Sequence, residues 1–241
     1  MPLHDWTRVN SGLFHHFHQG WCVEISRVLN RGKLQTEFSA LVEQKSGSKE
    51  ADVLAIEEKY PYRGEPDTGG TAVLERPKTK LVHRSDRDYY AEKASRVAIH
   101  HRLGKVVAFI EIVSPGNKHD ELSFERFVEK IVEAIRQRIH VMVIDLFPPT
   151  SRDPLGIHKA IWDHFEADEP FEDPNGQDRI LASYEADGTN TAFIEPIGLG
   201  ERFPEMPLFI SPGAHVLVPL EETYANAWSD TPGAVQRLVE Q

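Results

Sequence analysis

The sequence predicts an α/β protein with a mixed central sheet, built in the order helix, three to four strands, helix, strand, and followed by a C-terminal α+β extension. Three observations predict this class. Two segments, about 13–29 and 123–138, place their apolar residues on one helical face. Short alternating segments lie between them, as in half-buried strands. Two nearly continuous apolar runs, 105–113 and 140–147, flank the second helix, which is typical of strands covered on both faces.

The first helix has a cap on its N-terminal side and a stop on its C-terminal side. Ser11 or Gly12 is placed to cap it, and Asn30-Arg31-Gly32 ends it. Alternating residues then predict strands at 36–45 and 51–58.

The middle of the chain contains a long loop and the central strands. A Pro- and Gly-rich stretch from Glu58 to about Lys80 exceeds ordinary loop length, so we expect it to be mobile or functional. A tight turn at Leu103-Gly104 then joins strands at 95–102 and 105–113. Ser114 to Lys118 breaks the second of these strands before the second helix and the strand at 140–147.

The pattern changes after Pro148-Pro149. A short helix is followed by a hairpin about Asp187-Gly188, two further strands and a helical end. We therefore divide the chain into a core, residues 1–147, and an acidic C-terminal extension packed on it, residues 148–241. The extension is either a separate domain or, as we favour, a continuation of the same sheet.

Charge divides the chain in the same way. The formal net charge is −11, but residues 1–140 carry +2 and residues 141–241 carry −13. An acidic chain is a poor first candidate for binding nucleic acid, yet the nearly balanced first part is compatible with phosphate binding. A single cysteine, no signal-peptide pattern and no apolar run of about 20 residues favour a cytoplasmic protein without membrane association.

Two carboxylates occupy strand positions that are otherwise apolar. Glu111 lies inside the run 105–113, and burial of an unpaired carboxylate is costly, so it needs a cation, a hydrogen bond or a proton. Asp52 opens the strand at 51–58. Carboxylates at the ends of neighbouring strands are suitable ligands for Mg²⁺, which prefers oxygen. The alternative is that Glu111 pairs with an arginine and Asp52 caps a turn.

The turn after Glu111 presents two further candidates. Pro115 and Gly116 force a sharp exit from the strand, so Asn117 and Lys118 lie near its C-terminal end, where α/β sheets usually hold ligands. The Lys118 ammonium would stabilise developing negative charge there. A solvated loop lysine is the alternative.

These segments resemble a known family. EADVLAIE, VVAFIEIVSPGNK, and PLHDW with FHHFHQGW are similar to an uncharacterised bacterial family, domain of unknown function 4058. The order of elements also resembles the restriction-endonuclease-like core of the PD-(D/E)XK nuclease superfamily. That resemblance implies a Mg²⁺-dependent nuclease, a hydrolase in which Asp52 and Glu111 bind the metal, with Mn²⁺ as a substitute. A nucleic acid substrate and a homodimer follow as expected partners.

The chain departs from the superfamily motif at one position. A lysine usually lies two residues after the second acid, where this chain has Val113. Lys118 is the preferred replacement and Lys130 its competitor, although Lys130 is about 130° from the centre of the apolar face, which favours solvent. Glu24 on the first helix and Glu43 late in the first strand are further candidates.

The departure leaves two functions open. The first is metal-dependent phosphodiester hydrolysis by Asp52, Glu111 and Lys118. The second is a non-catalytic binding or interaction module that retains a degenerate nuclease-like fold. Other chemistries fit poorly, because the sequence has no nucleotide-binding glycine motif, no GxSxG and no zinc-ligand spacing.

Overall fold

A computed structural model of the chain describes residues 1–42, 53–57, 80–84, 104–167, 170 and 177–240. The helices in these ranges are α1 (Ser11–Val28), α2 (Glu121–Arg136), α3 (Gly156–Trp162), α4 (Leu220–Ser229) and α5 (Gly233–Val239), with short helical turns η1 (Trp6–Arg8), η2 (Leu29–Lys33) and η3 (Pro115–Lys118). The strands are β1 (Phe38–Val42), β2 (Val53–Glu57), β3 (Leu81–Arg84), β4 (Lys105–Ile112), β5 (His140–Asp145), β6 (Arg179–Glu185), β7 (Thr191–Ile197), β8 (Glu205–Ser211) and β9 (Ala214–Pro219).

A mixed sheet forms the centre of the described structure. Its strands follow the order β1-β2-β4-β5-β6-β7-β3, while β8 and β9 form a separate hairpin. β4 and β5 are parallel, and the other neighbouring pairs of the sheet are antiparallel. The predicted α/β class and mixed sheet are therefore confirmed, and the strands predicted at 36–45, 51–58 and 105–113 correspond to β1, β2 and β4. Across the described residues no helix is both long enough and apolar enough to cross a membrane.

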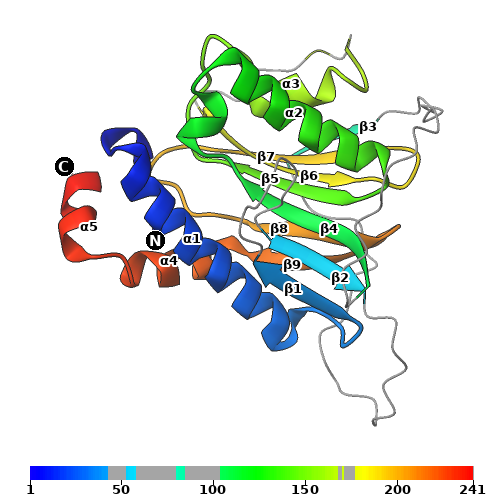
Figure 1. Cartoon of the computed structure of the whole chain (residues 1–241), viewed down its shortest axis with the longest axis horizontal. Coiled ribbons are helices and arrows are strands. Elements are labelled where there is room, and N and C mark those ends of the chain that lie inside the picture. The colour runs from blue at the N-terminus through cyan, green and yellow to red at the C-terminus, as the bar shows by residue number, and fades with distance from the viewer. Residues whose placement is uncertain (43–52, 58–79, 85–103, 168–169, 171–176, 241) are drawn as a thin grey trace.

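Helices cover both faces of the sheet (Figure 1). α2 and α3 lie on one face, over an apolar core that includes Phe127, Ile131 and Trp162. α1 lies on the other face with α4 and the β8–β9 hairpin, over a second core that includes Trp21 and Ile110. Alternate residues of β4 and β5 point into these two cores, which is why both strands have nearly continuous apolar sequences.

The start of α1 differs by one residue from the prediction. Asn10, rather than Ser11 or Gly12, is the N-cap, and its side-chain oxygen accepts a hydrogen bond from the Leu13 backbone N–H at 3.1 Å. The predicted apolar face is buried, and Phe14 and Trp21 are both fully enclosed. This face contacts α4, so the N-terminal helix packs on the C-terminal part of the chain.

The region after residue 148 contributes directly to the same sheet. β6 pairs with β5, and β7 pairs with β6 about the predicted turn at Asp187-Gly188. β3 was not predicted, because its four residues follow directly on the long Pro- and Gly-rich stretch; it pairs with β7. The predicted loop at 58–79 and the predicted strand at 95–102 lie outside the described residues. The helical end is longer than predicted and comprises α4 and α5.

Tyr224 of α4 links residues 4–6 at the N-terminus to the C-terminal helices by hydrogen bonds. Its buried hydroxyl accepts a hydrogen bond from Trp6 Nε1 at 3.0 Å and lies 2.9 Å from His4 Nδ1. His4 in turn stacks on Trp228, with ring centroids 3.8 Å apart. The opening residues are thus part of the core under α1 rather than a free arm.

We expect Tyr224→Phe to lower the free energy of unfolding by about 1–3 kcal/mol, because it leaves the buried Trp6 N–H without an acceptor. Urea unfolding followed by circular dichroism measures this loss. The m-value should stay unchanged, since the same surface becomes exposed. A loss below about 0.5 kcal/mol would show that the hydroxyl does not hold this segment.

Candidate functional site

Glu111 lies on the face of β4 that packs against α2. Phe109 and Val113, two residues to either side, belong to the apolar core beneath that helix. Glu111 is only 2% exposed. The ammonium of Lys130 on α2 reaches it, with Nζ 2.8 Å from Oε2. The buried carboxylate therefore has the cation that its position requires, supplied by a lysine rather than an arginine.

Lys130 departs from its predicted orientation towards solvent. The Lys130 side chain extends past the ring of Phe127 to Glu111. Its Nζ lies 5.2 Å from the centroid of that ring and 2.8 Å from Glu111 Oε2. A lysine side chain lays its methylenes along apolar surface and carries its charge far from its own Cα. The helical angle of Lys130 describes where its backbone lies on α2, but it predicted the wrong direction for the ammonium.

Lys118 points back to the sheet, but its partners differ from those predicted. Its Nζ lies 2.7 Å from Asp145 at the end of β5 and 2.6 Å from Asp153 in the loop that follows. The three side chains are almost completely buried. Lys118 thus joins the η3 turn to the segment after β5, and its ion pairs are not with Glu111.

One amine between two carboxylates leaves this cluster with an excess negative charge. Burial acts to lower the pKa of Lys118, but the attraction of Asp145 and Asp153 together outweighs burial and raises it. Burial raises the pKa of Asp145 to about 6, against the opposing attraction of Lys118. The two carboxylates share one amine, so the charge of Lys118 does not fully compensate the negative charge of Asp145. Lys118 itself, with two carboxylates beside it, stays protonated.

Asn117 and Glu24 have local partners. The Asn117 side-chain oxygen accepts hydrogen bonds from the backbone N–H and the hydroxyl of Ser114, at 2.8 and 2.9 Å, which closes the η3 turn. Glu24 is buried on α1, on the opposite face of the sheet from Glu111, and forms an ion pair with Arg27 of the same helix. Neither residue is brought to Glu111.

Asp52 and Glu43 lie outside the described residues. The nearest described position to Asp52 is Val53, the first residue of β2, whose backbone pairs with Ile110 of β4. The start of β2 is therefore beside the part of β4 that carries Glu111. Asp52 directly precedes that start in the sequence.

The described residues supply one carboxylate of the predicted metal site. Among them, no three His, Cys, Asp or Glu side chains come close enough together to hold a metal ion. Mg²⁺ commonly binds through one or two carboxylates and keeps several waters, so Glu111 with one further carboxylate has the appropriate chemistry. Asp145 and Asp153 do not serve this purpose here, because the Lys118 ammonium lies between them.

Sequence reasoning missed Asp145 and Asp153. Asp145 had the same signal as Glu111, a carboxylate near the end of an apolar strand. The argument that a buried carboxylate needs a partner therefore held for the run 140–147 as well as for the run 105–113. Asp153 had no such signal. Its carboxylate accepts hydrogen bonds from the Thr150 backbone N–H and hydroxyl, a turn formed only once the chain leaves β5.

Comparison with known proteins adds no relative: no protein-family model, no curated protein and no solved structure matches this chain. The resemblance to domain of unknown function 4058 and to the PD-(D/E)XK nucleases therefore stays a prediction, carried by the residues of the chain itself.

Proposed function

We propose that this chain is a divalent-metal-dependent phosphodiesterase that acts on nucleic acid. The observation that carries the proposal is the buried Glu111 carboxylate on β4 with the Lys130 ammonium 2.8 Å away. The Glu111 carboxylate on a central strand and the Lys130 ammonium that reaches it from α2 would supply two of the three groups that the nuclease-like site requires, the third being a second carboxylate. Lys130 replaces Lys118 in this proposal, because Lys118 is held by Asp145 and Asp153.

Each residue has a definite role in this proposal. Glu111 and Asp52 would bind Mg²⁺, which polarises the scissile phosphate and activates water when bound. Glu111 also holds Lys130 in place, so that the ammonium is positioned to stabilise negative charge on the phosphoryl group. The side chain of Lys130 is 20% exposed, so its ammonium lies near the surface while Glu111 lies beneath it.

A non-catalytic module with a degenerate nuclease-like fold is the second candidate. Lys118, the lysine nearest the end of the strand in sequence, serves a structural cluster instead of a reacting centre. The same interpretation extends to Glu111 and Lys130 if their ion pair serves only to join α2 to β4. The two candidates differ in whether the pair binds metal and supports hydrolysis.

The experiment measures cleavage of single-stranded DNA, duplex DNA and RNA by the purified full chain with Mg²⁺ or Mn²⁺. We expect Glu111→Gln and Lys130→Met each to lower the rate about 100-fold or more, which corresponds to about 2.7 kcal/mol of transition-state stabilisation. Glu195→Gln is the matched control, because Glu195 is also buried and pairs with a lysine, Lys80, at 3.1 Å. It should retain full activity.

Calorimetric titration with Mn²⁺ separates the two candidates. If the chain is a phosphodiesterase, Mn²⁺ must bind to the unaltered chain, and Glu111→Gln must abolish that binding. A chain that neither binds Mn²⁺ nor cuts any of the substrates is the non-catalytic module. The homodimer that we predict from the resemblance is checked in the same preparations by sedimentation.

A further inference from the structure

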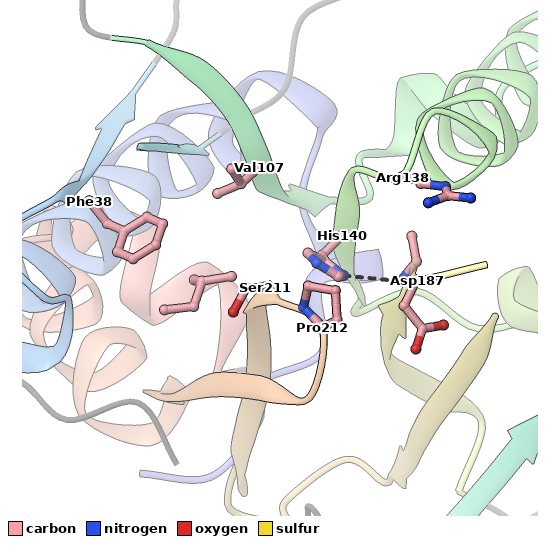
Figure 2. Close-up of a pocket in the computed structure, with 9 residues that line it drawn as sticks. Phe38, Val107, Arg138, His140, Asp187, Ser211 and Pro212 are labelled. Atoms are coloured by element: carbon pink, nitrogen blue, oxygen red, sulfur yellow. Dashed lines mark hydrogen bonds between the residues drawn. The ribbon is translucent and has the colours of Figure 1, made fainter. Parts of the chain in front are cut away.

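A cavity of about 270 Å³ opens on the α1 face of the sheet (Figure 2). It lies where the starts of β4 and β5, the loop after β6 and the β8–β9 turn meet. Val107 brings the start of β4 to its wall, whereas Glu111 lies near the end of that strand, on the face that packs against α2. The cavity is therefore separate from the proposed phosphodiesterase site, and its ligand does not depend on that function.

One side of the cavity is apolar. Its lining residues belong to the core on the α1 face or pack against that core: Phe38, Val107 and Ile210. The charged lining residues, Arg138 and Asp187, lie across the His140 ring from this apolar side (Figure 2). Small-molecule sites typically combine an apolar lining with a few polar groups, and drug-sized ligands need about 300 Å³ or more. This cavity accordingly suits a smaller ligand with a mainly apolar body.

His140 presents a neutral hydrogen-bond donor to the apolar side. Its Nδ1 accepts a hydrogen bond from the Ala186 backbone N–H at 3.0 Å, so the neutral ring carries its proton on Nε2. Burial lowers the pKa of His140 to about 4, which keeps the ring uncharged at pH 7. Nε2 faces away from Ala186, towards the side on which Val107 and Phe38 lie (Figure 2). His140 therefore offers a ligand an N–H group and no charge.

The Nε2–H group of His140 lacks an acceptor. The residue is only 3% exposed, and in the part of the chain that the structure describes Nε2 has no hydrogen-bond partner. A donor enclosed largely by apolar side chains is unfavourable until an acceptor reaches it, because it has given up most of its contact with water. A nearly buried N–H that is aimed into a cavity therefore indicates a ligand that carries an acceptor.

We propose that this cavity binds a small neutral carbonyl compound, such as a ketone, an ester or a lactone, with a compact apolar body. Its carbonyl oxygen would accept a hydrogen bond from His140 Nε2–H, and its body would lie against the apolar side. A carbonyl oxygen matches this donor because it only accepts. An ammonium group has no lone pair to offer Nε2–H, and a carboxylate would bury its charge against an uncharged donor.

The test titrates the full chain with acetophenone and follows the His140 ring protons and the Ala186 amide by NMR. Saturable shifts of both signals are expected. α-Methylstyrene has nearly the same shape but a CH₂ group in place of the carbonyl oxygen, so it leaves Nε2–H without an acceptor. Benzoate keeps the aromatic ring but must lose the hydration of its charge. We expect each of the two to bind at least about tenfold more weakly than acetophenone.

Two results of this titration would overturn the proposal. The first is α-methylstyrene or benzoate binding as tightly as acetophenone, which would mean that the cavity selects for apolar shape or for charge rather than for a neutral acceptor. The second is that acetophenone, cyclohexanone and γ-butyrolactone, which differ in the size and shape of the body, all leave the His140 and Ala186 signals unmoved.

His140→Asn tests the donor itself. The asparagine oxygen can accept from the Ala186 N–H in place of Nδ1, but the shorter side chain does not reach the position of Nε2–H. Affinity for acetophenone, followed at the Ala186 amide, should fall about tenfold or more. The preference for acetophenone over α-methylstyrene should disappear, which a merely structural role of His140 would not cause.

His158→Asn is the matched control. His158 is also buried, and its Nδ1 lies 3.0 Å from the Tyr184 hydroxyl, in the core beneath α2 and α3 on the other face of the sheet. This variant should bind acetophenone as the unaltered chain does. A folded His140→Asn protein with unchanged affinity and unchanged preference would overturn the proposal. If His140→Asn does not fold, the comparison of acetophenone with α-methylstyrene on the unaltered chain decides the matter.

Discussion

Replacing Lys118 with methionine is expected to lower the free energy of unfolding at pH 7 by about 3–5 kcal/mol. Methionine has similar length and no charge. The Lys118 ammonium lies 2.7 Å from Asp145 and 2.6 Å from Asp153, and its removal leaves two buried carboxylates near each other with no cation between them. Urea unfolding followed by circular dichroism measures the loss, which should exceed that of any exposed lysine.

Lys33→Met is the control for this comparison. Lys33 also pairs with a carboxylate, Glu205 at 3.7 Å, but both side chains are about half exposed. Surface pairs of this kind contribute little, so we expect a change within about 0.5 kcal/mol. A Lys118→Met protein that loses less than about 1 kcal/mol would contradict the structural role, and would make Lys118 a candidate for the reacting centre again.

The α/β class and the central helices and strands were predictable because burial leaves periodic patterns. α1, α2, β4 and β5 each bury one or both faces, and their apolar spacing was sufficient to assign them. The four-residue strand β3 was not predictable, since its pairing with β7 is formed by residues more than 100 positions away in the sequence. Local pattern carries no information about such a pairing.

The candidate site was only partly predictable, for a different reason. A sequence pattern shows that a carboxylate such as Glu111 is buried, but not which cation reaches it. Lys118 and Lys130 are both within reach in sequence, and the choice depends on where each ammonium lies at the end of four flexible bonds.

Asp145 is expected to make the protein less stable as the pH rises from about 4 to about 6. Burial raises its pKa to about 6, compared with about 3.9 in an unfolded chain, so the folded state binds more protons in this interval. The stability that the protonated form contributes is complete below pH 4 and lost as the pH passes 6. This rise in pKa corresponds to about 3 kcal/mol at pH 7.

Asp145→Asn isolates this effect. Asparagine keeps the shape of the side chain and leaves Lys118 paired with Asp153 alone, so the cluster no longer has excess negative charge. The stability of Asp145→Asn relative to the unaltered chain should therefore increase by up to about 3 kcal/mol between pH 4 and pH 7. Urea unfolding at several pH values measures this difference.

The difference between the two proteins is the informative quantity, because other groups act in the opposite direction. Burial lowers the pKa of His140 to about 4, so the stability it contributes is lost as the pH falls below about 6.5. Both proteins carry His140, and its effect cancels in the difference. A difference that stays constant from pH 4 to pH 7 would mean that Lys118 compensates both carboxylates fully. In that case an excess negative charge in the buried cluster cannot be the common cause of the two expected effects. These effects are the large loss of stability in Lys118→Met and the gain of stability in Asp145→Asn.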